Sequence, residues 1–202
     1  FTSPAFVARV NYHGVKGLRV GASFYYNQTA KNGTKPWRNT GYKFPVTIVT
    51  GDLQYKGFNN NLIVRGNAVY GNLGASGALT TINNSSSAAS GYPNATVAQN
   101  AVSYGGEAGY NIGSFFHSKA PRIYPFIRYE YYNPMEKTEA NTGLLADKRF
   151  QVSAVTAGLN YYALPNLVIK ADYTHRSIGG GKYNDENLVS VGIAYIGWFI
   201  KK

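Results

Sequence analysis

The sequence predicts an all-β chain that contributes about nine strands to an antiparallel transmembrane β-barrel. Three observations support this fold class. Apolar and polar residues alternate with period two in successive blocks separated by Gly, Asn, Ser and Pro. Tyrosine, with 18 residues among 202, recurs at the ends of these blocks. The connections between the blocks alternate between short and long, as the periplasmic turns and external loops of outer-membrane barrels do.

Each block places apolar side chains on one face of a strand and polar side chains on the other. In the first block, for example, Val10 and Tyr12 share a face opposite Arg9 and Asn11. No segment shows a convincing helical period, so no helix is expected. The predicted strands cover residues 6–13, 18–27, 46–56, 61–72, 100–111, 122–133, 150–162, 167–176 and 187–199.

The order of the connections predicts the direction of the strands. They are short at 13–17, 57–60 and 163–166, long at 28–45, 73–99 and 134–149, medium at 112–121 and medium-long at 177–186. The last strand follows a long external loop, so it runs towards the periplasm. Bacterial single-chain barrels have even strand numbers. An odd count of nine therefore predicts that residues 1–202 form one domain at the C-terminal side of a longer chain.

A soluble β-sandwich is the alternative fold, because it also alternates apolar and polar residues. The tyrosines favour the membrane barrel, since an apolar ring with a polar tip suits the boundary between lipid and water. The residues expected to form this girdle are Tyr12, Tyr26, Tyr55, Tyr70, Tyr110, Tyr131, Tyr161 and Tyr195.

The composition restricts the possible partners. No run approaches the ~18 apolar residues of a membrane-spanning helix, and the absence of cysteine excludes disulfides and thiolate metal sites. The net charge of +11 raises nucleic acid as a partner, but the basic residues are scattered rather than clustered. Lipopolysaccharide phosphates, outer-membrane lipid and anionic solutes are the expected partners instead. The N-terminal residues 1–4 show no signal-peptide pattern.

Several segments resemble Gram-negative porins, most of all Bacteroidota-type porins related to the phosphate-selective porin group. They are Asn160–Tyr162 before Leu164–Asn166, then Val168–Tyr173 and Val191–Phe199, with Tyr124–Tyr132 and Gly17–Gly21. The resemblance implies a bacterial outer-membrane location and a barrel of roughly 16–18 strands, often assembled as a homotrimer. One departure is that Ile200-Lys201-Lys202 follow Phe199, where such chains end on an aromatic residue.

Alternation assigns ten charged side chains to the inside of the barrel. The predicted pore-lining residues are Arg9, Arg19, Asp52, Arg65, Glu107, Arg128, Glu130, Lys170, Asp172 and Arg176. Opposed charges in an aqueous pore select ions by sign, so a porin for small hydrophilic solutes with a mild anion preference is expected. The same residues could also be wall residues that pair with one another. The competing function is a structural or accessory barrel subunit that assembles with other outer-membrane proteins.

No catalytic, cofactor or metal site is expected, and the chain is not expected to be an enzyme. Gly179–Lys182 lacks the following Ser or Thr and the helix of a phosphate-binding loop. His13, His117 and His175 lie far apart. A phospholipase of the outer membrane would carry Ser and His on the lipid face, where His175 falls, but no serine is assigned to the same depth. The Ser- and Asn-rich stretch 73–99 is expected to be a loop that constricts the pore, stays external or docks a partner.

Overall fold

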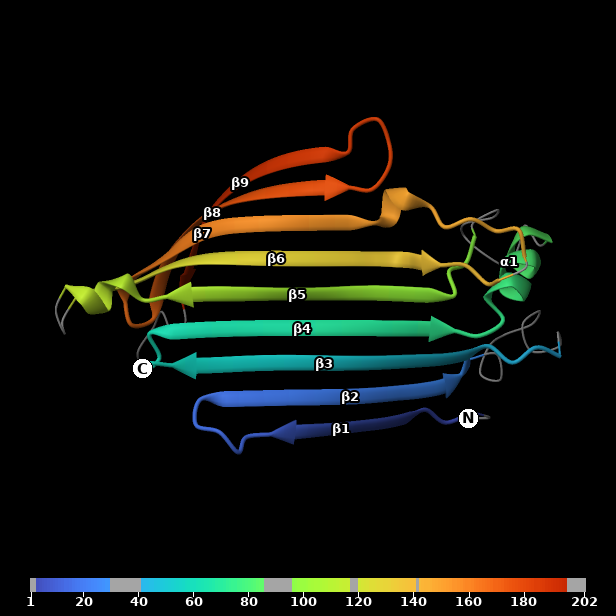
Figure 1. The fold of residues 1–202 in the computed structure, drawn as a ribbon, viewed down its shortest axis with the longest axis horizontal. Coiled ribbons are helices and arrows are strands. Elements are labelled where there is room, and N and C mark those ends of the chain that lie inside the picture. Colours follow the sequence, from blue (N-terminus) through green and yellow to red (C-terminus); the bar gives the residue numbers. More distant parts are fainter. Residues whose placement is uncertain (1–2, 30–40, 86–95, 117–119, 141, 196–202) are drawn as a thin grey trace, which may run out of the picture.

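The computed structural model describes residues 3–29, 41–85, 96–116, 120–140 and 142–195. They form one antiparallel sheet whose nine strands lie side by side in sequence order (Figure 1). The strands are β1 (Phe6–Tyr12), β2 (Leu18–Gln28), β3 (Pro45–Gly57), β4 (Leu62–Leu73), β5 (Asn100–Tyr110), β6 (Arg122–Lys137), β7 (Val152–Leu164), β8 (Leu167–Ile178) and β9 (Asp185–Tyr195). All nine predicted strands are confirmed, although the part of the ninth beyond 195 lies outside the described residues.

The pairing register keeps the two kinds of side chain on separate faces throughout the sheet. Because side chains alternate along a strand, residues that pair across neighbouring strands share a face. The apolar face carries, among others, Val10, Val20, Leu53, Val64, Ile127, Leu159 and Ile193. The charged face carries the residues of the opposite parity, such as Arg9, Arg65 and Arg128. The predicted division of each strand into two faces is therefore confirmed.

The sheet is strongly curved, with β8 and β9 curling away from the plane of β3–β5 (Figure 1). Asn67 of β4 and Ser190 of β9 line the same hollow on the charged face, although four strands separate them in the sheet. Strands that far apart approach one hollow only when the face they share is concave. The charged face is therefore the concave side, and the apolar face is the convex side.

The two ends of the sheet differ in their connections. The short-turn end carries connections 13–17, 58–61, 111–121 and 165–166, and the 3₁₀ helix η3 (Ile112–Phe115) lies in the third of these. The long-loop end carries 29–44, 74–99, 138–151 and 179–184, with the 3₁₀ helix η4 (Lys148–Phe150). The last connection is shorter than predicted, because Ser177 pairs with Asp185 and the Ile178 N–H donates to the Asn184 carbonyl at 2.6 Å.

One prediction is wrong: the stretch 73–99 contains the helix α1 (Ser76–Ser85). This helix is held by contacts from other segments, and its own sequence has no periodic apolar pattern from which a helix could be predicted. The Glu139 carboxylate accepts from the Gly77 N–H at the first turn, and the Thr80 hydroxyl accepts from the Val97 N–H at 2.9 Å. Figure 1 places α1 at the long-loop end of the strands rather than midway along the charged face. Residues 86–95 of the stretch lie outside the described residues.

Hydrogen bonds within one short segment order the connection between β6 and β7. Asp147 precedes η4, and its carboxylate accepts from the Arg149 backbone N–H at 2.9 Å and from the Arg149 guanidinium at 2.6 Å. These bonds, that of the Arg149 side chain first, lower the pKa of the Asp147 carboxyl below its ordinary value of 3.8. The Asp147 N–H lies 3.1 Å from the sulfur of Met135, which ties the segment to β6.

The sheet has almost no core. In the described part of the chain the buried hydrophobic side chains are Phe44, Tyr124 and Val152, whereas Val10, Ile127 and Ile193 on the apolar face are 71%, 58% and 72% exposed. No second sheet covers that face in the described part, so the layers of a β-sandwich are missing there. The described sheet is open, since β1 pairs with β2 alone and β9 with β8 alone. None of the described helices is long and apolar enough to span a bilayer.

Candidate functional site on the charged face

All ten side chains that the sequence predicts to line a pore lie on the concave, charged face. Strand pairing arranges most of them in two neighbouring rows that cross the sheet. The first row runs Arg19, Gln54, Arg65, Glu107, Arg128, Thr156 and Thr174. The second runs Asn11, Gly21, Asp52, Asn67, Gly105, Glu130, Ala154, Arg176 and Glu186. Residues that lie far apart in the sequence thus form one band of fixed charges.

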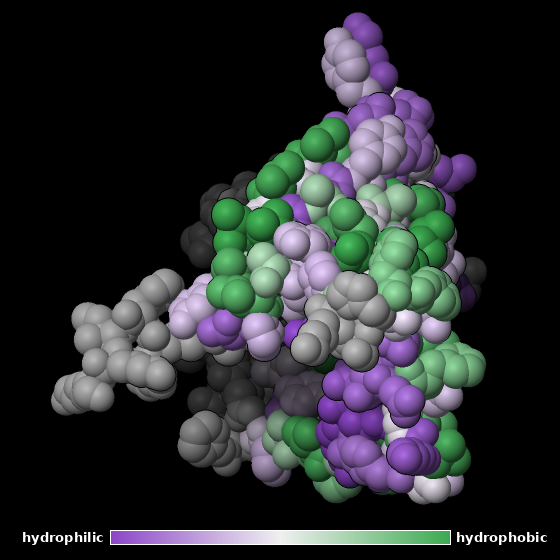
Figure 2. Space-filling view, turned by 90° about the vertical axis from the view of Figure 1, so that its left-hand side faces the viewer, coloured by the Kyte–Doolittle hydropathy of each residue, from purple (hydrophilic) through white to green (hydrophobic). Residues whose placement is uncertain are grey.

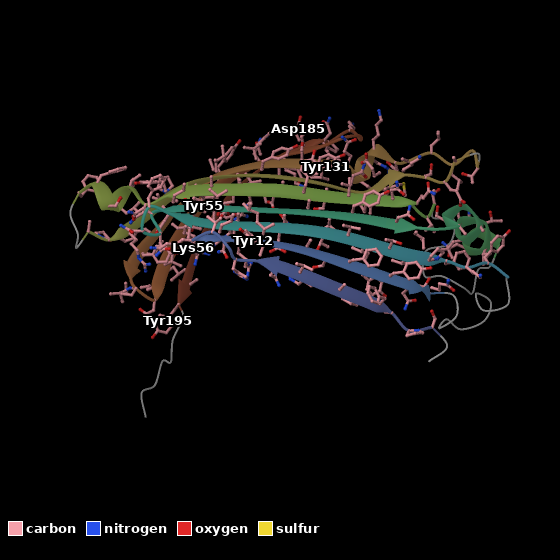
Figure 3. The ribbon with its side chains drawn as sticks, turned by 60° about the horizontal axis from the view of Figure 1, so that its bottom comes forward. Tyr12, Tyr55, Lys56, Tyr131, Asp185 and Tyr195 are labelled. Carbon is pink, nitrogen blue, oxygen red and sulfur yellow. The ribbon has the colours of Figure 1, made fainter. Side chains whose placement is uncertain are left out.

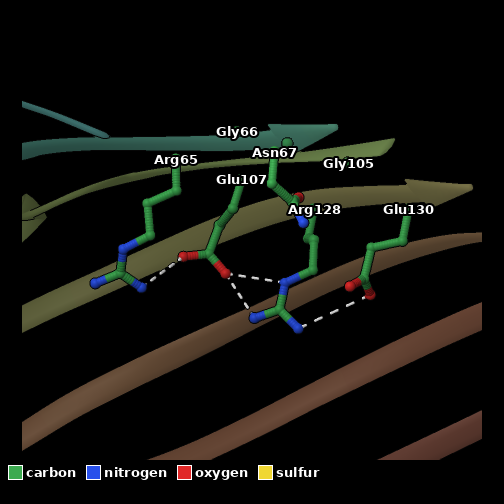
Figure 4. A pocket seen from close by; sticks show the side chains of 8 residues that line it. Arg65, Gly66, Asn67, Gly105, Glu107, Arg128 and Glu130 are labelled. Atoms are coloured by element: carbon green, nitrogen blue, oxygen red, sulfur yellow. Dashed lines mark hydrogen bonds and ion pairs between the residues drawn. The ribbon is translucent and has the colours of Figure 1, made fainter. Parts of the chain in front are cut away.

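Glu107 of β5 is the centre of this band (Figure 4). Its carboxylate accepts from Arg128 of β6 at 2.6 Å and pairs with Arg65 of β4 at 3.3 Å. Arg128 also lies 4.0 Å from the Glu130 carboxylate. The Glu107 side chain is 18% exposed and the two arginine side chains are 56% and 40% exposed. One shielded carboxylate is therefore shared by two cations that still face water.

A second shared carboxylate lies nearer β1. The Asp52 side chain of β3 pairs with Arg9 of β1 at 2.7 Å and with Arg19 of β2 at 3.6 Å. The Arg9 side chain reaches Asp52 by crossing above β2 at Gly21. A Cβ atom at Gly21 would clash with the Arg9 guanidinium and lie 2.5 Å from the Asp52 carboxylate. The absence of a side chain at Gly21 therefore permits an ion pair between two strands that are not neighbours.

A third cluster contains an acidic residue that the sequence did not assign to this face. Arg176 of β8 pairs with Glu186 of β9 at 2.7 Å and donates to the Tyr132 hydroxyl of β6 at 2.9 Å. The sequence placed Glu186 in the last connection, because the apolar alternation becomes recognisable only after it. The pairing of Ser177 with Asp185 shows that β9 begins earlier. With Glu186, the six cations of the predicted set face five carboxylates rather than four.

Lys170 and Asp172 are the two members of the predicted set outside these clusters. They lie on β8 opposite Gly192 and Ser190 of β9. Within the described residues, no ion pair of 4 Å or less holds either side chain. Both charges are therefore available to ions in the adjoining water.

Two adjoining hollows follow the band. One, of about 300 Å³, is lined by Arg65, Asn67, Glu107, Arg128 and Glu130 together with glycine backbone. The other, of about 320 Å³, continues from Asn67 and Glu130 towards Arg176 and Ser190. Gly105, which shares the charged face with Asn67 and Glu130, has no side chain to fill this space. The band therefore borders a continuous polar depression wide enough for hydrated ions.

Two rows of tyrosines bound the apolar face. Tyr12, Tyr55 and Tyr195 lie towards the short-turn end, and Tyr131 lies towards the other end (Figure 3). The span from Tyr104 to Tyr110 on β5 is ~20 Å, and residues 18–26 of β2 span ~27 Å, at ~3.4 Å per residue. All eight tyrosines of the predicted girdle lie on this face by their register: Tyr12, Tyr26, Tyr55, Tyr70, Tyr110, Tyr131, Tyr161 and Tyr195.

Figure 2 looks onto the short-turn end. Hydrophobic residues lie on both sides of the upper half of this view, where Figure 1 places β7–β9, and hydrophilic residues gather in the lower half.

In the part of the chain that the structure describes, no three His, Asp or Glu side chains are close enough to hold a metal ion. His13 and His175 are described, and they lie at opposite ends of the sheet. His117 lies outside the described residues.

No protein-family model matches this chain, and no curated protein matches it. The predicted resemblance to porins therefore remains a prediction. The functional assignment has to rest on the geometry of the two faces.

Proposed function

We propose that the chain is part of the wall of an outer-membrane β-barrel that acts as a porin for small hydrophilic solutes and ions. One observation carries the proposal: a single curved sheet has an exposed apolar convex face and a charged concave face. A water-soluble protein leaves no such apolar face exposed, because contiguous apolar patches on soluble monomers reach only a few hundred Å². In a membrane barrel, the apolar convex face would contact the lipid hydrocarbon outside and the charged concave face would contact the water inside.

The placement of the tyrosines supports the membrane part of the proposal. Outer-membrane barrels carry aromatic girdles at both edges of their apolar band. On this sheet the tyrosines of the apolar face likewise lie towards both ends of the strands. With the short turns in the periplasm and the long loops outside, lipid and lipopolysaccharide would contact the convex face between and above these tyrosines.

The concave face supports the transport part. Its ion pairs hold the arginine side chains along the wall, so the hollows beside them stay open to water. The predicted set with Glu186 holds six cations against five carboxylates, and Lys56 and Arg122 lie on the same face by their register, so positive charge is in excess. Fixed charges of this kind select by sign. The expected preference for anions is therefore mild.

Closure of the barrel requires additional strands. In an antiparallel sheet of nine consecutive strands, β1 and β9 run in the same direction, so they cannot pair antiparallel with each other. An odd number of further strands between these two edges restores the alternation. A barrel of roughly 16–18 strands, as a homotrimer or with other outer-membrane proteins, satisfies this condition.

Conductance of the purified protein in a planar lipid bilayer tests the function. A porin gives steady open channels, and the reversal potential in a salt gradient shows an excess of anion flux. Membrane insertion without any channel would replace the porin assignment with the accessory-subunit assignment. A preference for cations would overturn the anion preference while leaving the pore intact.

A further inference from the structure

Among the polar side chains near the long-loop end of the apolar face is a cluster on β8 and β9. His175 of β8 lies directly opposite Asn187 of β9, and Ser177 lies directly opposite Asp185. All four share the apolar face. His175 pairs with Val155 of β7, and Ser177 pairs with Ser153, which in turn pairs with Tyr131 of β6. Polar side chains on a surface that otherwise meets hydrocarbon are costly and mark functional positions.

Hydrogen bonds fix the orientation of the histidine ring. The Asn187 side-chain oxygen receives the Tyr173 hydroxyl at 2.7 Å and lies 3.0 Å from Nδ1 of His175. Because that oxygen can only accept, Nδ1 carries the proton and donates it. In the neutral ring, Nε2 then has a free lone pair. An imidazole held by one acceptor, with its other nitrogen unprotonated, is the general base of a nucleophilic pair.

Ser177 is the hydroxyl placed to complete the pair. It follows His175 by two residues, so the two side chains project from the same face ~6.6 Å apart along the strand. No described residue holds the Ser177 hydroxyl in a hydrogen bond, which leaves it able to turn towards the imidazole. The hydrogen bond between a nucleophile and its general base is commonly long or poorly aligned in structures without substrate. The sequence missed this serine because the predicted strand stopped at 176, whereas β8 continues to Ile178.

The depth of Ser177 identifies the substrate class. Tyr104, Tyr131, Ser153 and Ser177 form one cross-strand row. Ser177 is the second-last residue of β8, at the long-loop end of the strand. If the convex face meets lipid, as proposed above, this strand end lies at the boundary between headgroups and acyl chains. The ester carbonyls of glycerophospholipids lie at that boundary. Lys148 of η4 adjoins the glycine turn after Ser177, and within the described residues no ion pair holds its ammonium group, which suits a lipid phosphate.

We infer that Ser177, His175 and Asn187 form a lipid-facing acyl-ester hydrolase site on the outside of the barrel. This inference departs from the expectation that the chain is not an enzyme, and it rests on the proposed membrane placement but not on the pore. Ser177 is the nucleophile and His175 the general base. Asn187 is a positioning residue that holds the ring through Nδ1.

The reaction proceeds in two balanced steps. The Ser177 oxygen bonds to the ester carbonyl carbon, the Ser177 proton moves to Nε2 of His175, and the carbon–oxygen bond to the glycerol breaks. The proton on Nε2 passes to the departing alkoxide, which leaves as lysophospholipid. Water then gives a proton to Nε2 and its oxygen to the acyl carbon, and the Ser177 oxygen leaves with that proton. The products are a free fatty acid and restored Ser177.

The turn after Ser177 supplies donors for the oxyanion. Among the described residues, the Gly179 N–H is used by the Gln151 carbonyl at 2.8 Å, whereas the N–H groups of Gly180 and Gly181 have no acceptor. Free backbone N–H groups stabilise the negative oxygen that forms on the carbonyl during attack. The glycines of the 179–182 segment, which does not fit a phosphate-binding loop, would thus serve as oxyanion donors beside Ser177.

The test measures fatty-acid release by the purified protein from mixed micelles of phosphatidylethanolamine and non-ionic detergent. A fluorophosphonate, which labels activated serines covalently, provides a second readout by mass spectrometry of the labelled peptide. Ser177→Ala and His175→Ala should each lower the rate by ~10³-fold or more and abolish labelling. Asn187→Ala should lower both, and Asn187→Asp, which keeps an acceptor for Nδ1, should restore them.

Two serine controls separate the site from general effects. Ser190→Ala removes a hydroxyl from the charged face of the neighbouring strand, and Ser153→Ala removes one from the same row as Ser177. Both variants should keep wild-type rates. No fatty-acid release and no labelling in the wild type, full activity in Ser177→Ala, or labelling of Ser153 would each overturn the inference.

The bilayer conductance of the same preparations distinguishes this inference from the proposed function. The substitutions at Ser177, His175 and Asn187 all lie on the convex face, so they should not change the channel conductance. Channels without hydrolysis would remove the hydrolase and leave the porin. Hydrolysis that depends on Ser177 without channels would keep the hydrolase and remove the porin.

Discussion

Glu107→Gln tests whether the charged face controls ion passage. The carboxylate is shared by Arg65 at 3.3 Å and Arg128 at 2.6 Å, so its loss leaves two arginines with one fewer partner. An ion ~5 Å away in water feels ~0.8 kcal/mol from one unit charge, and screening at ~0.1 M salt lowers this to ~0.5 kcal/mol. The anion gains and the cation loses this amount, so the anion-to-cation permeability ratio should rise about fivefold.

The assay is the reversal potential of single channels in a potassium chloride gradient, wild type against variant. Glu139→Gln is the matched control, because it removes the same charge from the long-loop end, beside α1. It should change the ratio much less. An unchanged ratio in Glu107→Gln, or an equal shift in both variants, would refute the assignment of the charged face to the ion path. Protein stability should fall by no more than ~1 kcal/mol, because the two arginines are largely solvated.

Three further perturbations test other parts of the structure. Gly21→Ala should separate the ion pair that crosses above it, lowering the unfolding free energy by up to ~1 kcal/mol in denaturant titrations, while Gly51→Ala, with no atom within 4 Å of its Cβ, should not. Ile127→Arg should destabilise the bilayer-inserted protein by ~2–4 kcal/mol near mid-depth, and Asn67→Arg on the charged face should not; equal effects would contradict the membrane placement of the convex face. Asp147→Asn should weaken η4: the wild-type carboxyl, with its pKa below 3.8, stabilises this segment fully above that value and loses the effect as pH falls through the lowered pKa. The protection of the η4 amides against hydrogen exchange, relative to the intrinsic rate at each pH, should therefore fall at low pH in the wild type and be low at neutral and low pH in the variant.

The strands and their faces could be predicted because both follow from period-two alternation alone. A strand with one apolar and one polar face shows its orientation in every pair of neighbouring residues. Arg9, Arg65 and Arg128 could thus be assigned to one face without knowledge of any partner. Which carboxylate each arginine contacts depends on strand order and register, which single strands do not encode.

The ends of the strands could not be predicted, and the missed functional residues lie there. Ser177 and Glu186 belong to strands because β8 and β9 pair with each other, not because their own neighbours alternate. The helix α1 was missed for a related reason. Its N-terminus is held by Glu139, which lies far along the chain, and its sequence shows no apolar stripe.

The shared carboxylate of Glu107 has a consequence for assembly. Side chains change face when a strand slips by one residue against its neighbours. If β5 slipped in this way, Glu107 would turn to the apolar face, and Arg65 and Arg128 would lose their common anion. In the proposed membrane placement, a misaligned hairpin would thus bring a carboxylate without a partner into the lipid, where charged groups are strongly disfavoured. The ion pairs of Glu107 therefore also favour the correct register while neighbouring strands pair.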